Sequence, residues 1–122
     1  MIQFSRGSVR DLRLAMLYGG WTPLQDACFW RRSLYESISG IDANLKYAAD
    51  YDLFLRMALQ GKAAYVPLTF SAFRRHPGQK SISGSTSYQE ERVQVRKREL
   101  ARAPGSAAQK TLCRLWHEAA IR

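Results

Sequence analysis

Cysteine is scarce in this sequence, which has two, Cys28 and Cys113, among 122 residues. So few cysteines exclude a disulfide scaffold, and they do not have the spacing of a zinc site. No uninterrupted apolar run approaches the roughly 20 residues that a membrane span requires. The opening MIQFSRGSVR lacks the apolar stretch of a signal peptide, and the glycine motifs of nucleotide-binding loops are absent. We therefore expect a cytoplasmic protein with no secretory leader and no membrane-spanning helix.

Acidic residues are also few, and they are unevenly distributed. Lys and Arg number 19 and Asp and Glu 10, which gives a net charge of +9. Residues 1–61 contain 7 basic and 6 acidic side chains, including all five aspartates, whereas residues 62–122 contain 12 and 4. A half with a net charge of +8 is suited to phosphate, nucleic acid or an anionic membrane face. Any chemistry that needs carboxylates is expected in the first half.

Apolar periodicity and turn residues predict a single α/β domain. Residues 1–20 form a helical lead-in, residues 21–87 the main domain, and residues 88–122 basic C-terminal helices. The predicted strands are Ala27–Trp30, Ala63–Val66 and Leu68–Arg74. The predicted helices are Ser33–Ile38, Asp50–Gln60, which ends at Gly61, then Tyr88–Ala103 and Ala107–Ala120.

The sequence Asp50-Tyr51-Asp52 is the first candidate site. Two carboxylates at the start of a helix could bind a metal or provide a general base. The alternative is a purely structural acidic first turn, which favours the helix dipole and is common. Spacing alone favours the structural interpretation.

Basic residues form two further candidates. Arg74, Arg75 and His76 end a predicted strand and are followed by a Ser/Gly loop with Lys80. These residues could bind a phosphate, and His76 could also coordinate a metal. The alternative is a solvated strand end with no ligand, which would have the same residue pattern.

The second basic cluster lies on the predicted helix from Tyr88 and includes Arg92, Arg96 and Lys97. Aromatic residues are almost absent there, which argues against a platform for single-stranded nucleic acid. A solvated helix, or one that lies on anionic lipid, is the better interpretation.

Three segments in order resemble the C-terminal half of a bacterial family 2 glycosyltransferase with a GT-A fold. They are QDACFWRRSLYESISGIDANLKYAADYDLFLRMALQG, AAYVPLTFSAFRRH and PGQKS, and the resemblance covers roughly residues 21–92. It implies a partial GT-A-like α/β domain with short mixed strands and a C-terminal helical extension. Two positions depart from the family pattern: Ala49 stands where many members have Glu, and Ser39-Gly40 replaces a glycine pair.

The resemblance also implies roles for individual residues. Asp50 matches the catalytic base, and Asp52 matches the following acidic position of the same helix, where it would support substrate binding. Gln25 and Trp30 match positions on the acceptor side. Three residues match the region near the donor diphosphate: Arg74, His76 and Lys80, with His76 also a weak candidate for a metal ligand. We expect Asp50 and His76 in one cleft with Arg74 beside it.

The implied reaction moves a sugar from a nucleotide-diphosphate donor to the hydroxyl of a sugar or lipid-linked acceptor, with inversion, in polysaccharide biosynthesis. No Asp-x-Asp precedes Asp50, so the nucleotide-binding half, with its divalent Mg or Mn, is missing. We expect a truncated fragment that is inactive alone and binds no metal tightly. It would be cytoplasmic, and peripheral on the inner membrane face if the arginines meet lipid. The alternative is a basic non-enzymatic module for anionic membrane or nucleic acid, although no specific nucleic acid is expected.

Overall fold

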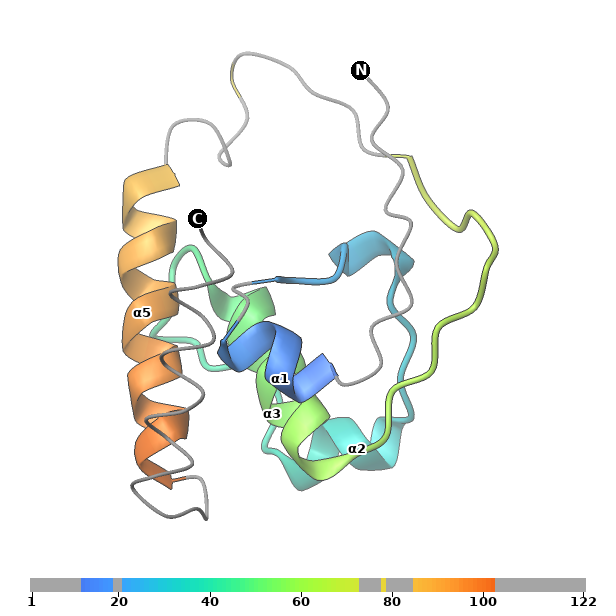
Figure 1. Cartoon of the computed structure of the whole chain (residues 1–122), viewed down its shortest axis with the longest axis horizontal. Helices are drawn as coiled ribbons and strands as arrows, with labels where there is room; N and C mark the ends of the chain where they lie inside the picture. Colours follow the sequence, from blue (N-terminus) through green and yellow to red (C-terminus); the bar gives the residue numbers. More distant parts are fainter. Residues whose placement is uncertain (1–11, 19–20, 73–77, 79–84, 103–122) are drawn as a thin grey trace.

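A computed structural model describes residues 12–18, 21–72, 78 and 85–102 (Figure 1). Its elements, in order, are α1 (Leu12–Leu17), the 3-10 helix η1 (Gln25–Ala27), α2 (Arg32–Ser37), α3 (Ala49–Gln60) and α5 (Ser85–Arg102). These residues form helices and connecting segments and contain no β-strand. The predicted α/β class, with its mixed strands, is therefore wrong for the part of the chain that is described.

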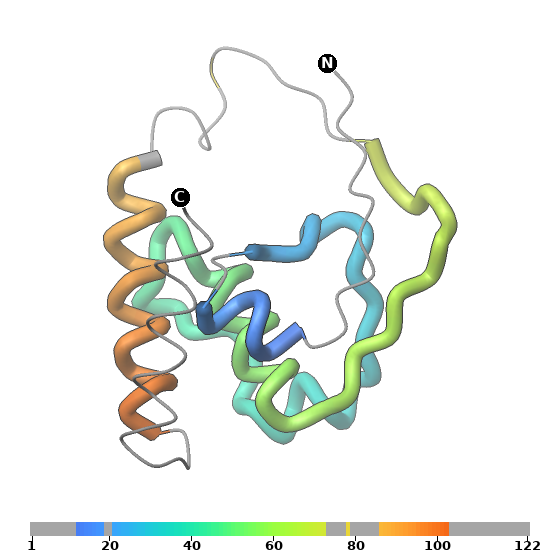
Figure 2. Tube along the Cα trace, in the orientation of Figure 1, coloured from blue at the N-terminus to red at the C-terminus, as the bar shows by residue number. Residues whose placement is uncertain are grey.

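Where the structure describes them, the predicted strands are stretches of chain that no neighbouring strand pairs with, and the last two residues of Leu68–Arg74 lie outside the described residues. Ala27 ends η1, and the residues after it continue without a ladder. Within residues 62–72 one backbone hydrogen bond is made, from the amide of Leu68 to the carbonyl of Val66 across Pro67, at 2.8 Å. Figure 2 shows this segment leaving α3 and running along the outside of the helices. Apolar and β-branched composition does not make a strand unless a second strand provides the other half of the ladder.

The helices agree better with the sequence. The predicted helix Asp50–Gln60 is α3, and it ends at Gly61, whose amide donates to the Met57 carbonyl at 2.7 Å. The predicted helix Ser33–Ile38 corresponds to α2, and α5 begins slightly before the predicted start at Tyr88. The predicted helix Ala107–Ala120 and most of residues 1–20 lie outside the described residues.

α3 is the centre of the fold and packs against α1, α2 and α5. Seven of its 12 residues are buried, so it is apolar on more than one face. The core contains Met16, Leu17, Ile38, Ala48, Tyr51, Leu53, Phe54, Leu55, Met57 and Val95. The hydroxyl of Tyr51 donates to the carbonyl of Met16 at 2.6 Å, which ties α3 to α1.

α5 is the longest helix, with 18 residues, and Figure 1 shows it standing beside the other helices. Val95 and Glu99 on this helix are buried. No helix in the described ranges is long and apolar enough to cross a bilayer.

Candidate functional site

The start of α3 is held by a side chain from α5. Ala48, at the N-cap, has no side chain that can cap the helix. The carboxylate of Glu91 instead accepts hydrogen bonds from the amides of Lys46, Tyr47 and Ala48, at 3.1, 2.7 and 2.7 Å. Because such charge-assisted bonds are stronger than neutral ones, α5 fixes the chain that leads directly into Asp50.

The two carboxylates of Asp50-Tyr51-Asp52 have different surroundings. Asp52 is completely buried, and its Oδ2 accepts from Nε of Arg56 at 2.9 Å while its Oδ1 accepts from Arg98. Side chains two residues apart on a helix do not face each other, and Asp50 is only partly buried. The pair therefore does not form a shared metal site, and Asp52 belongs to an ion network of the core.

Arg56 extends this network to the turn after α2. It donates to the carbonyls of Ile38 and Gly40, at 2.6 and 2.7 Å. Ser39 and Gly40 both have positive φ, 63° and 66°. A Cβ on Gly40 would lie 2.8 Å from the ring of Tyr35, so a larger residue would have to displace that ring and also adopt a left-handed backbone conformation. The acidic and basic residues that follow Asp50 in the motif thus stabilise the fold.

Asp50 lines a hollow together with two other residues that the sequence singled out, Gln25 and Trp30. The remaining lining residues are Thr22, Pro23, Leu24, Asp26 and Tyr88. One oxygen of Asp50 accepts from the amide of Tyr51 at 2.7 Å, and within the described ranges its carboxylate makes no ion pair. Trp30 is held by an edge-to-face contact with Phe54, with ring centroids 5.8 Å apart, and remains 41% exposed.

Tyr88 lines this hollow from α5, and the sequence did not identify it as a site residue. Burial raises the pKa of its phenol, and the nearby Asp50 carboxylate adds to the rise. The guanidinium of Arg92 lies over the rings of both Tyr88 and Tyr51, at 5.4 and 4.8 Å from their centroids. The spacing of Tyr88, Arg92, Val95 and Glu99 is that of one helix face, and this pattern could have identified the side of α5 that faces the fold.

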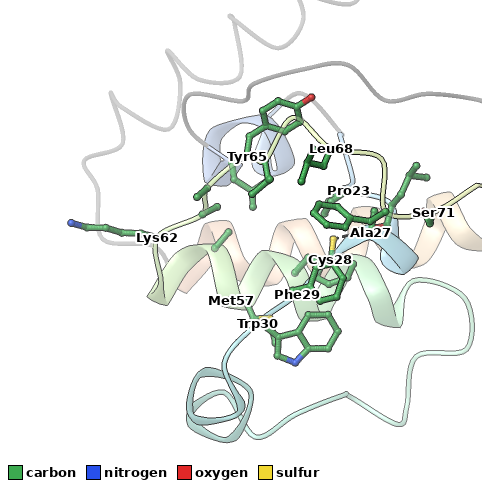
Figure 3. A pocket seen from close by; sticks show the side chains of 18 of the residues that line it. Pro23, Ala27, Cys28, Phe29, Trp30, Met57, Lys62, Tyr65, Leu68 and Ser71 are labelled. Atoms are coloured by element: carbon green, nitrogen blue, oxygen red, sulfur yellow. Dashed lines mark hydrogen bonds between the residues drawn. The ribbon is translucent and has the colours of Figure 1, made fainter.

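A second, larger groove is apolar. It lies between α3, residues 28–30 and the segment 62–71 (Figure 3). Phe29 and Phe70 meet edge to face across it, with centroids 5.2 Å apart, although Phe29 is 78% exposed. The Cys28 thiol donates to the Leu24 carbonyl at 3.1 Å, and burial raises its pKa to about 11. The groove therefore presents apolar side chains, and its Cys28 thiol is protonated and unreactive at neutral pH.

The predicted donor-side residues Arg74, His76 and Lys80 lie outside the described residues. The grouping of Asp50 with His76 in one cleft therefore stays a prediction, as does the metal role of His76. Where the structure describes the chain, no group of three or more His, Cys, Asp or Glu side chains could hold a metal ion. The resemblance assigns the Mg or Mn of a complete enzyme to the nucleotide-binding half, and the described residues provide no such cluster for it.

The basic residues of α5 do not form one solvated face. Arg98 contacts Asp52, Asp42 and Glu99, and Arg92 lies on tyrosine rings. Lys97 is exposed. Part of the positive charge of this helix thus stabilises the fold, and less of it is available to an anionic partner.

No protein-family model, no curated protein and no solved structure matches this chain. The resemblance to family 2 glycosyltransferases is therefore an expectation that rests on sequence motifs alone.

Proposed function

We propose that this chain provides the acceptor side and the general base of a glycosyltransferase. The main support is that Asp50, Gln25 and Trp30, which come from α3, η1 and the segment before α2, line one hollow. Asp50 is at least 20 residues from the other two in the sequence, so chain connectivity alone does not place it beside them. The motif resemblance had assigned the base to Asp50 and the acceptor side to Gln25 and Trp30.

The surroundings of the two carboxylates support Asp50 as the base. A general base must reach the substrate proton through space that the substrate can enter. Asp50 lines such a space, whereas both oxygens of Asp52 are occupied by arginines in the core. We therefore assign proton transfer to Asp50, and assign Asp52 to holding α3 against α5.

The reaction is a single displacement with inversion. The acceptor hydroxyl oxygen bonds to the anomeric carbon of the donor sugar as the bond from that carbon to the diphosphate oxygen breaks. The hydroxyl proton passes to the carboxylate of Asp50, and the electron pair of the broken bond leaves with the nucleoside diphosphate. The resemblance assigns the donor to a nucleotide-binding half, so the 122-residue chain alone is expected not to transfer sugar.

Acceptor binding tests this proposal directly. Isotope-labelled protein is titrated with a panel of oligosaccharides while backbone amide and tryptophan indole resonances are followed by NMR. We expect at least one glycan to shift the resonances of Gln25, Trp30 and Asp50. Gln25→Ala, an exposed position on η1, should weaken that binding. Ser33→Ala, an exposed position outside the hollow, is the matched control.

Three outcomes separate the proposal from the alternative of a basic binding module. Shifts confined to the hollow support it, and in an assembly that also binds donor, Asp50→Asn should then lower kcat by about 10²–10⁴. No shift with any glycan, or shifts that avoid the hollow, contradicts it. Binding to DNA with a steep salt dependence, without any glycan binding, indicates the alternative.

A further inference from the structure

The hollow that Asp50 lines has an unusual charge for this protein. Its described lining includes two carboxylates, Asp26 and Asp50, and no lysine or arginine. The chain as a whole has a net charge of +9. The nearby Arg92 is not part of the lining, and its guanidinium lies over the rings of Tyr51 and Tyr88. Within the part of the chain that the structure describes, the charged groups that line the hollow are therefore both negative, and a ligand would meet them at contact distance.

The other groups around the hollow are suited to a polyhydroxylated ring. Trp30 and Tyr88 provide aromatic surface, and Gln25 provides an amide that both donates and accepts hydrogen bonds. Carboxylates accept hydrogen bonds from hydroxyl groups, and these bonds are stronger than neutral ones. Apolar ring faces together with a few oriented polar groups are typical of a site for a small ligand.

We infer that this hollow selects neutral sugars and rejects sugars that carry a carboxylate, sulfate or phosphate. The inference rests on the proposed function and adds the substrate class to it. An acidic sugar would bring its charge next to Asp26 and Asp50, and like charges at a binding surface disfavour the complex. A neutral sugar keeps the hydrogen bonds without this repulsion. The net positive charge of the chain acts in the opposite direction, and so does Arg74, which the resemblance implies beside the same cleft. The carboxylates of Asp26 and Asp50 must outweigh both.

Matched pairs of sugars test the inference on the full chain at pH 7. The probes are oligosaccharides that end in glucose or glucuronic acid, and in galactose or galacturonic acid, titrated with detection at the resonances of Gln25 and Trp30. We expect each neutral sugar to bind about tenfold more tightly than its acidic partner. Added salt should reduce this preference, because it screens exposed charges.

Removing one carboxylate at a time identifies the side chain that causes the preference for neutral sugars. Asp26→Asn should reduce the preference for neutral sugars severalfold, because Asp26 is exposed on η1 and lines the hollow. Glu36→Gln removes the same charge from an exposed position on α2 outside the hollow and should leave the preference unchanged.

The outcomes distinguish the inference from the proposed function. Acidic sugars that bind in the hollow as tightly as neutral ones overturn the inference and leave the acceptor role intact. An equal effect of Asp26→Asn and Glu36→Gln also overturns it, because the whole-chain charge would then set the preference. Failure of every sugar to bind overturns both.

Discussion

Replacing Asp52 with Asn tests whether this carboxylate stabilises the fold. The change keeps the shape of the side chain and removes its charge. Arg56 and Arg98 would then face a neutral amide at a position that is completely buried. Removing one partner of a buried ion pair leaves uncompensated charge, which typically costs about 3–5 kcal/mol.

The surroundings of the two arginines place the expected loss at the lower end of that range. Arg98 keeps Glu99 at 2.8 Å and Asp42 at 3.5 Å, and its side chain is 30% exposed. Arg56 keeps the carbonyls of Ile38 and Gly40. We therefore expect the free energy of unfolding to fall by about 3 kcal/mol, which for a domain of this size lowers Tm by roughly 10 °C.

Urea unfolding followed by circular dichroism at the helical band measures this loss. Glu36→Gln is the control, because it breaks an exposed pair with Arg32 on α2 that is worth about 0.3–0.5 kcal/mol. Asp50→Asn should cost less than about 1 kcal/mol, the usual effect of a carboxylate in a first helical turn. If Asp52→Asn costs no more than Glu36→Gln, with an unchanged m-value, the buried ion network does not stabilise the fold.

Three further results are expected. Glu91→Ala should destabilise the chain by about 2 kcal/mol. It should also speed hydrogen exchange at the amides of Tyr47 and Ala48, because both donate to that carboxylate. Unchanged exchange would contradict the view that Glu91 caps the start of α3. In a Cys113→Ser background, the free energy of unfolding should fall as pH rises from about 9 towards 11, because the unfolded thiol of Cys28 ionises first. Cys28→Ser should show a smaller fall, because the buried phenols of Tyr51 and Tyr88, whose pKa values are also raised, contribute only near the upper end of this range. Sedimentation of the chain with anionic vesicles should be weak, because part of the basic charge on α5 contacts other residues of the fold. High salt should abolish the binding, and equal binding to neutral vesicles would show that it does not depend on charge.

The sequence predicted helices well because their signals are local. The apolar spacing of α3 and its stop at Gly61 are contained in a dozen adjacent residues, and the structure has both. The strands failed for the opposite reason. Segments such as Ala63–Val66 have strand-like composition, but a ladder requires a partner that composition cannot provide, and the described residues contain none.

The residues of the candidate site also differ in whether a local sequence signal marks them. Asp50 is a candidate because an acidic helix start is visible in the sequence, and the resemblance adds Gln25 and Trp30. Tyr88 and Glu91 were missed because their roles arise only when α5 docks beside the start of α3. The hydrogen bonds of Glu91 span more than 40 residues along the chain, and no local pattern specifies such a pairing.

Helix geometry separates the two roles of the acidic pair. Residues two apart on a helix lie on opposite sides, so a helix whose one side faces a core can direct one carboxylate inward and the next outward. In α3 the inward position is Asp52, and a buried carboxylate requires partners, which Arg56 and Arg98 supply. The outward position is Asp50, which lies beside Tyr88 of the same α5 that provides Arg98. The docking of α5 therefore neutralises the structural aspartate and completes the hollow around the proposed base, so a loss of that docking would affect stability and acceptor binding together.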